Sequence, residues 1–115
     1  MNINRETQQK IQEIQILDQN LQNILMQKQT FQLELNENSN ALEEVKNTKD
    51  SIYKIIGQVM IKSDKEKVLK DLEDKKKLFE LRLGALEKQE KLLGSKAKEL
   101  QSEAEKLMKK PETKK

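Results

Sequence analysis

The side chains that could carry out covalent or metal chemistry are scarce in this sequence. It contains no histidine and no cysteine, so it offers no imidazole base, no thiol nucleophile and no ligand set for a zinc finger. It also has no nucleophile paired with a base and no glycine-rich loop that could cradle a nucleotide phosphate. We therefore expect a protein that is not an enzyme and that uses no cofactor and no metal.

The remaining chemistry is that of charged and aliphatic side chains. Of the 115 residues, 37% are charged and 34% are hydrophobic, with one tyrosine, two phenylalanines and no tryptophan. So little aromatic mass disfavours a compact core. No apolar run approaches the ~20 residues that cross a bilayer, and no secretory segment follows Met1. We expect a soluble, cytoplasmic protein without a membrane segment, and the missing cysteines fit a reducing compartment.

The elements that must position these side chains begin with a long helix over about residues 5–50. Apolar residues recur there at alternating steps of three and four, a period that keeps one side of a helix facing a partner helix. Neither glycine nor proline occurs in residues 1–56. The series is interrupted only by Lys28, Asn38 and Lys49, and it consists of Ile14, Leu17, Leu21, Ile24, Phe31, Leu35, Leu42, Val45 and Ile52.

A second helix is predicted over about residues 64–110, followed by a basic tail at 111–115. Ser63 and Glu66 have the spacing of a capping box, and Pro111 is a helix-ending residue. Large apolar residues recur every seventh position, and a companion series lies three residues before each of them. The two series are Leu72, Phe79, Leu86, Leu93, Leu100 and Leu107, and Leu69, Lys76, Leu83, Glu90, Ala97 and Ala104.

Between the helices, residues 51–62 are rich in β-branched side chains and have Gly57 near their centre, which favours a β-hairpin. A single hairpin is marginal in water, so its apolar side chains are expected to meet hairpins of other chains. The alternative is that they pack under the first turns of the helices. These subunit-assembly residues are Tyr53, Ile55, Ile56, Val59, Met60 and Ile61.

The expected fold is therefore mainly α, a long antiparallel two-helix coiled coil joined by one β-hairpin. We expect a register that places Leu42 opposite Phe79, Leu35 opposite Leu86, and Ile14 opposite Leu107. The charge is uneven, with five basic and eight acidic residues in positions 1–50 against eighteen and twelve in positions 51–115. This asymmetry suggests that the halves face each other or that one end meets an acidic partner.

Three short stretches of the chain resemble a known family. Residues 53–57 (Tyr-Lys-Ile-Ile-Gly) and 60–65 are similar to the hairpin signature of prefoldin β-type subunits, and residues 82–90 resemble the second-helix motif of that family. The resemblance implies a hetero-hexamer of two α-type and four β-type subunits, whose hairpins join into a β-barrel body. It further implies an ATP-independent chaperone that holds unfolded client proteins at coiled-coil tips and passes them to a group II chaperonin.

The resemblance also suggests where such contacts lie. Apolar residues near the free helix ends could open into a client-binding surface, or could merely complete the coiled coil; they are Ile11, Ile14, Leu17, Leu100, Leu107 and Met108. Lys106, Lys109 and Lys110 could dock on an acidic chaperonin surface, or could belong to a solvated tail. Nucleic-acid binding is not expected, because no aromatic residues or arginines accompany these lysines. The competing function is a passive coiled-coil scaffold or tether, which leaves the hairpin unexplained.

Overall fold

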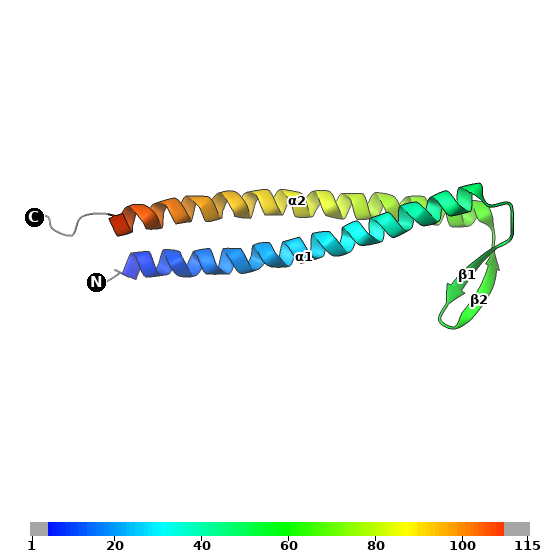
Figure 1. The fold of residues 1–115 in the computed structure, drawn as a ribbon, viewed down its shortest axis with the longest axis horizontal. Coiled ribbons are helices and arrows are strands. Elements are labelled where there is room, and N and C mark those ends of the chain that lie inside the picture. Colours follow the sequence, from blue (N-terminus) through cyan, green and yellow to red (C-terminus); the bar gives the residue numbers. More distant parts are fainter. Residues whose placement is uncertain (1–4, 110–115) are drawn as a thin grey trace, which may run out of the picture. The chain divides into compact units, whose positions relative to one another are not determined.

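The computed structural model describes residues 5–109, which form four elements (Figure 1). In chain order these are the helix α1 (Arg5–Asn47), the strands β1 (Ile52–Ile56) and β2 (Val59–Ser63), and the helix α2 (Lys65–Lys109). The described chain falls into two compact units. We call residues 5–27 with 86–109 the terminal unit, and residues 28–85 the hairpin unit. The predicted mainly α class, with two long helices and one hairpin between them, is confirmed.

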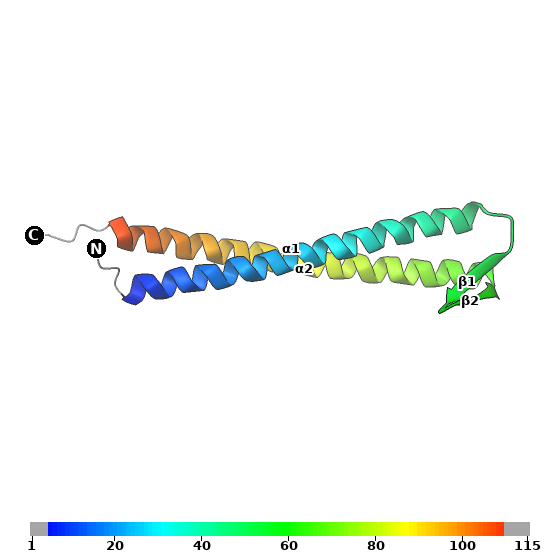
Figure 2. The ribbon, with the colours of Figure 1, turned by 60° about the horizontal axis from the view of Figure 1, so that its bottom comes forward.

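In the terminal unit, the first part of α1 lies antiparallel beside the last part of α2, as both ribbon views show (Figures 1 and 2). The buried side chains belong to the predicted heptad series, because only one side of each helix faces the other. They are Leu17, Ile24, Leu86, Leu100 and Ala104, together with Thr7. The contact between the two helices, which we call the seam, is therefore narrow and mostly aliphatic in this unit.

In the hairpin unit, an antiparallel pair of strands connects the end of α1 to the start of α2 and projects from the helices (Figure 1). Ile52 pairs with Ser63 and Ile56 with Val59, which leaves a two-residue turn. Gly57 opens this turn with a φ of 63°, and no other residue among those described has a positive φ. A positive φ at the first central residue alone is typical of a type II′ turn, which suits the twist of a hairpin and requires glycine there.

Helix α1 ends at Asn47, slightly earlier than the predicted end near residue 50. The backbone N–H of Thr48 still donates to the carbonyl of Glu44 at 3.0 Å. The Thr48 hydroxyl, however, accepts a hydrogen bond from the N–H of Asp50 at 3.2 Å. Such a local side-chain bond replaces the next helical one and turns the chain out of the helix.

The predicted capping box at the start of α2 is wrong. Ser63 is the last residue of β2, and its hydroxyl donates to the carbonyl of Ile61 at 3.4 Å. The first helical bond of α2 instead runs from the N–H of Val68 to the carbonyl of Asp64 at 3.0 Å. Asp64 therefore occupies the cap position, because it is the residue whose carbonyl accepts the first bond.

The predicted register of the two helices is also wrong, by about two to three helical turns. Phe79 faces Phe31 at a ring-centroid distance of 6.2 Å, whereas Leu42 was expected opposite it. The lengths of the two connections account for this shift. Residues 48–51 link α1 to β1, whereas Asp64 alone links β2 to α2, and these lengths determine which residues of the two helices lie opposite each other. In the terminal unit Lys10 contacts Glu103, which the expected register would have placed near Asp18, a residue of like charge.

Candidate functional site

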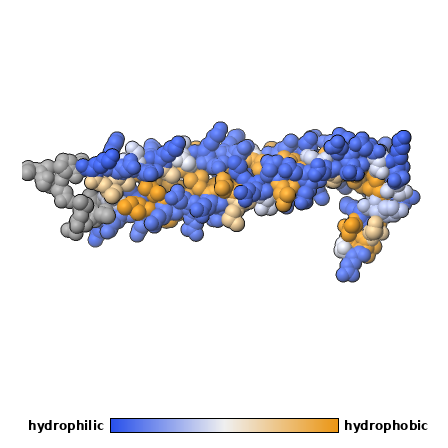
Figure 3. All heavy atoms as spheres, in the orientation of Figure 1, coloured by the Kyte–Doolittle hydropathy of each residue, from blue (hydrophilic) through white to orange (hydrophobic). Residues whose placement is uncertain are grey.

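The hairpin presents the densest group of exposed apolar side chains in the described chain. All six predicted assembly residues are exposed, from 46% for Ile61 to 71% for Ile55. We call them the hairpin surface: Tyr53, Ile55, Ile56, Val59, Met60 and Ile61. Figure 3 shows hydrophobic atoms gathered on this segment. Six exposed apolar side chains on one short segment, in a chain with 37% charged residues, are typical of a surface that another protein covers.

The strand register places these side chains on both faces of the hairpin. Ile55 pairs with Met60, so their side chains share one face, while Ile56 and Val59 share the other. Within residues 5–109 the sheet has only these two strands, so each has an open edge. The outward N–H and C=O groups of an open edge are a template for pairing with another strand. The hairpin can therefore be extended by backbone bonds and covered by side chains.

A hollow of about 500 Å³ lies between β1 and α2 in the hairpin unit. Tyr53 and Ile55 line it from the strand, and Val68 and Leu72 line it from the helix. Lys54 and Asp71 approach within 3.8 Å of each other at its rim. The hairpin surface is thus continuous with an apolar recess that a packed neighbour could also fill.

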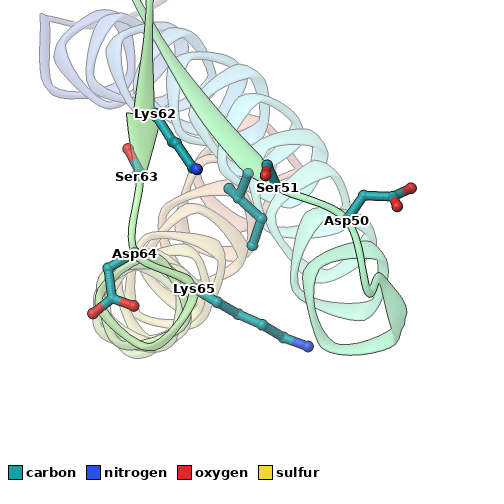
Figure 4. Close-up of a pocket in the computed structure, with 7 residues that line it drawn as sticks. Asp50, Ser51, Lys62, Ser63, Asp64 and Lys65 are labelled. Atoms are coloured by element: carbon teal, nitrogen blue, oxygen red, sulfur yellow. The ribbon is translucent and has the colours of Figure 1, made fainter.

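The junction of the helices holds the hairpin at its base. The Lys65 ammonium donates to the carbonyls of Lys46 at 3.3 Å and Thr48 at 3.0 Å. Figure 4 shows this side chain reaching from the start of α2 toward the end of α1. A cation at a helix C-terminus is favourable, because the last carbonyls carry partial negative charge. Lys65 thereby ties the end of one helix to the beginning of the other.

The seam of the hairpin unit contains polar and aromatic contacts that fix the pairing of the helices. Asn38 is only 7% exposed, and its side-chain amide donates to the carbonyl of Leu72 at 2.8 Å. The guanidinium carbon of Arg82 lies 5.7 Å from the centre of the Phe31 ring, which also faces Phe79. The directional bond of Asn38 allows one alignment of the helices, which aliphatic contacts alone would not select.

The predicted client-binding residues are not equally accessible. Leu17 and Leu100 are buried in the seam of the terminal unit, and Ile11, Ile14 and Leu107 are half-buried. Met108 is exposed. Most of these side chains therefore complete the helix pair in this structure, and only separation of the terminal turns would present them fully.

A polar contact also joins the two helices of the terminal unit. The Lys10 ammonium lies 2.7 Å from a carboxylate oxygen of Glu103. This hydrogen bond raises the pKa of Lys10 above its ordinary value of 10.5. Lys106 and Lys109 are exposed, whereas Lys110 and the predicted basic tail at 111–115 lie outside the described residues.

Sequence reasoning did not single out several exposed apolar residues that lie off the heptad positions. They are Met26, Leu33, Leu78, Leu81 and Leu92. The available signal was their position in the heptad frame, because a leucine outside the seam series has no partner on the opposite helix. Leu81 at 74% and Leu92 at 72% are the most exposed of them, and Leu92 directly precedes the heptad residue Leu93.

Residues 5–109 contain neither a helix that could span a membrane nor a cluster of side chains that could hold a metal ion. No helix there is both long enough and apolar enough to cross a bilayer. The same residues contain no cluster of three or more acidic, histidine or cysteine side chains placed to hold a metal ion.

Three kinds of similarity connect the chain to known proteins. A family model described as "Prefoldin subunit" matches residues 8–111. The prefoldin subunit beta of Thermococcus onnurineus is 43% identical over 101 residues, which cover 86% of this chain and 87% of the relative. That of Thermococcus kodakarensis is 37% identical over 112 residues, or 96% of each chain. The crystal structure of the prefoldin beta subunit from Thermococcus strain KS-1 has a TM-score of 0.88 and 36% identity, and covers 96% of this chain and 98% of that one.

Proposed function

The chain belongs to the prefoldin subunit family as a β-type member, and we propose that it is an ATP-independent holdase subunit that binds unfolded proteins. The resemblance predicted from the hairpin motif is thereby confirmed. Prefoldin subunits are chaperones and not enzymes, in keeping with the expectation from residue types. The subunit forms part of a prefoldin complex; its clients, stoichiometry and chaperonin partner belong to the proposal.

One observation carries the proposed assembly: six exposed apolar side chains on a two-stranded hairpin with open edges. In the proposed complex, two α-type and four β-type subunits combine their hairpins into a β-barrel body. Barrel closure pairs the open edges, and packing covers the hairpin surface. Each β-type copy contributes one hairpin, which is too small to bury both faces alone.

The proposed client contacts lie in the terminal unit, at Ile11, Ile14, Leu17, Leu100, Leu107 and Met108. Terminal helical turns open at little free-energy cost, so the half-buried and buried members become accessible when the turns separate. Each buried methylene contributes only about 0.8 kcal/mol, so a single subunit holds a client weakly. Several subunits that grip one unfolded chain raise the overall affinity through effective concentration.

Delivery to a group II chaperonin is the final step of the proposal. Lys106, Lys109 and Lys110 are the proposed docking residues, because their ammonium groups suit an acidic surface. Binding that depends on such exposed charges weakens as salt is added. A cytoplasmic location, which membership of this family implies, completes the proposed function.

Native mass spectrometry of the chain with an α-type prefoldin subunit tests this function against that of a passive tether. We expect the chain to change size on mixing and to reach a complex of two α-type and four β-type copies. The complex should then suppress aggregation of a chemically denatured protein without ATP. A chain that forms the same dimer with and without the α-type subunit, and that suppresses no aggregation, would instead be a coiled-coil tether.

A further inference from the structure

A second surface of the terminal unit carries an inference of its own. A groove of about 380 Å³ runs between α1 and α2, lined by seven residues from the two helices. None of the seven is charged, although more than one residue in three of the whole chain is. We call it the amide groove: Asn20, Asn23, Ile24 and Gln27 from α1, and Gln89, Leu92 and Leu93 from α2.

The groove has an apolar floor and amide walls. Ile24 is buried and Leu93 half-buried, while the four amide side chains are exposed. Leu92 is 72% exposed, so a large apolar side chain lies beside the groove without a partner helix to cover it. Within residues 5–109 these four amides donate and accept no hydrogen bonds to or from other protein groups.

A primary amide side chain offers two N–H donors and a carbonyl acceptor, the same groups that a peptide backbone uses. Amide walls can therefore pair with the N–H and C=O groups of any extended segment, whatever its side chains. Charged walls would attract segments of opposite sign and repel the rest. The apolar floor and Leu92 add contacts for aliphatic side chains. An unfolded chain presents both features together, since its backbone is unpaired and its apolar side chains are exposed.

We propose that the amide groove binds an extended segment of unfolded polypeptide by its backbone, and so without selecting a sequence. This inference rests on the proposed holdase function and adds a second client contact to the apolar residues near the helix ends. The volume of the groove falls in the range of ~300–1,000 Å³ typical of ligand sites, so it accommodates a few residues at a time. The apolar contacts with Ile24, Leu92 and Leu93 provide most of the binding free energy. The amide contacts pair with the peptide backbone and therefore do not depend on the sequence of the client.

The test uses the full chain and two fluorescently labelled peptides of one neutral sequence built from leucine, alanine and serine. One peptide has ordinary amides, and the other carries N-methyl groups at alternate positions, which remove donors. Fluorescence anisotropy should show at least fivefold weaker binding of the methylated peptide. Equal affinity for the two peptides would overturn backbone recognition.

Isosteric variants locate the contact. Asn23→Asp with Gln89→Glu removes amide donors from the groove without changing side-chain shape, and should weaken binding of the ordinary peptide at least fivefold. Gln12→Glu with Gln19→Glu adds the same two charges at exposed positions of α1 outside the groove, and should leave binding unchanged. Equal effects of the two variants would overturn the groove as the site.

Two further measurements separate the possible failures. If the parent complex suppresses aggregation but the groove variant binds peptide normally, the amide groove is not a client site, while the proposed holdase function stands. If the parent neither binds peptide nor suppresses aggregation, the holdase function itself is wrong. A groove variant that loses self-association of the chain, as measured by sedimentation, would mean that a second copy occupies the groove and would also overturn the proposal.

Discussion

At the scale of single residues, two polar contacts between the helices make different contributions. Asn38 bonds a backbone carbonyl from a nearly buried position, whereas Lys10 and Glu103 pair at a partly exposed edge. A buried hydrogen bond contributes about 1 kcal/mol, and exposed ion pairs contribute less because water and salt screen them. The Asn38 contact is therefore the stronger determinant of how the helices align.

Replacing Asn38 should lower stability measurably. Asn38→Ala removes the bond to the Leu72 carbonyl and some packing, so we expect the free energy of unfolding to fall by about 1–2 kcal/mol. Urea unfolding followed by circular dichroism measures this loss. Asn40→Ala, at an exposed position on the same helix, is the matched control and should change stability far less. Equal losses in the two variants would argue against the contact.

The pair formed by Lys10 and Glu103 should make stability depend on alkaline pH. The pKa of Lys10 is raised in the folded state by its hydrogen bond to Glu103, so the folded state holds this proton more tightly. The contribution is then fully present below the ordinary pKa of 10.5 and is lost as pH rises through the folded value. Lys10→Met should therefore lower the melting temperature at neutral pH, and the difference from the parent should vanish at strongly alkaline pH. A difference that is independent of pH would contradict the ion pair.

At the scale of elements, the hairpin surface predicts which substitutions should prevent assembly of the subunits. Ile55→Asp places a carboxylate where the proposed assembly is covered by other hairpins, and burying an unpaired charge costs several kcal/mol. We expect loss of the complex with an α-type subunit while helicity is retained. Leu81→Asp, at another exposed apolar position in the hairpin unit, is the control and should still assemble. Size-exclusion chromatography and circular dichroism measure the two properties, and full assembly of the Ile55 variant would rule out the hairpin as the joint.

The elements themselves were predictable from the sequence because the heptad series spans many turns, and each repeat supports the others. The exposed hairpin was predictable for a similar reason, since a two-stranded segment cannot bury both of its faces. The register was not predictable from these patterns. It depends on the bond between the Thr48 hydroxyl and Asp50 and on the single residue Asp64, which set the lengths of the two connections. The apolar pattern repeats every seven residues, so a pairing of the helices shifted by a whole heptad fits the sequence almost equally well.

The amide groove was invisible in the sequence for another reason. Its four amides come from two helices, and their juxtaposition depends on the register that sequence reasoning placed wrongly. Glutamine and asparagine are also ordinary residues for a helix surface, so their types alone gave no signal. Only the neutrality of the whole lining distinguishes this surface from the charged surroundings.

At the scale of the whole molecule, client contacts and subunit assembly should depend on different parts of the chain, the terminal unit and the hairpin respectively. A variant with Ile11, Leu107 and Met108 all changed to serine should form the complex with the α-type subunit but lose most suppression of aggregation, because apolar contact area is removed. Light scattering of a denatured test protein measures the effect. A variant with Leu33, Leu78 and Leu81 changed to serine removes three exposed apolar side chains from the hairpin unit and should suppress normally. Equal suppression by the two variants would place the client contacts elsewhere.

Tyr53 has a practical consequence because it is the one tyrosine of a chain that has no tryptophan. Its ring lies on the hairpin and is 53% exposed, so the intrinsic fluorescence of the chain originates at the surface where subunits are proposed to join. Quenching by a dissolved small molecule should decrease as the hairpins become covered, and it needs no attached dye. Binding of a client without tyrosine or tryptophan at the terminal unit should leave that emission unchanged, so the quenching reports the joining of subunits and not the loading of a client.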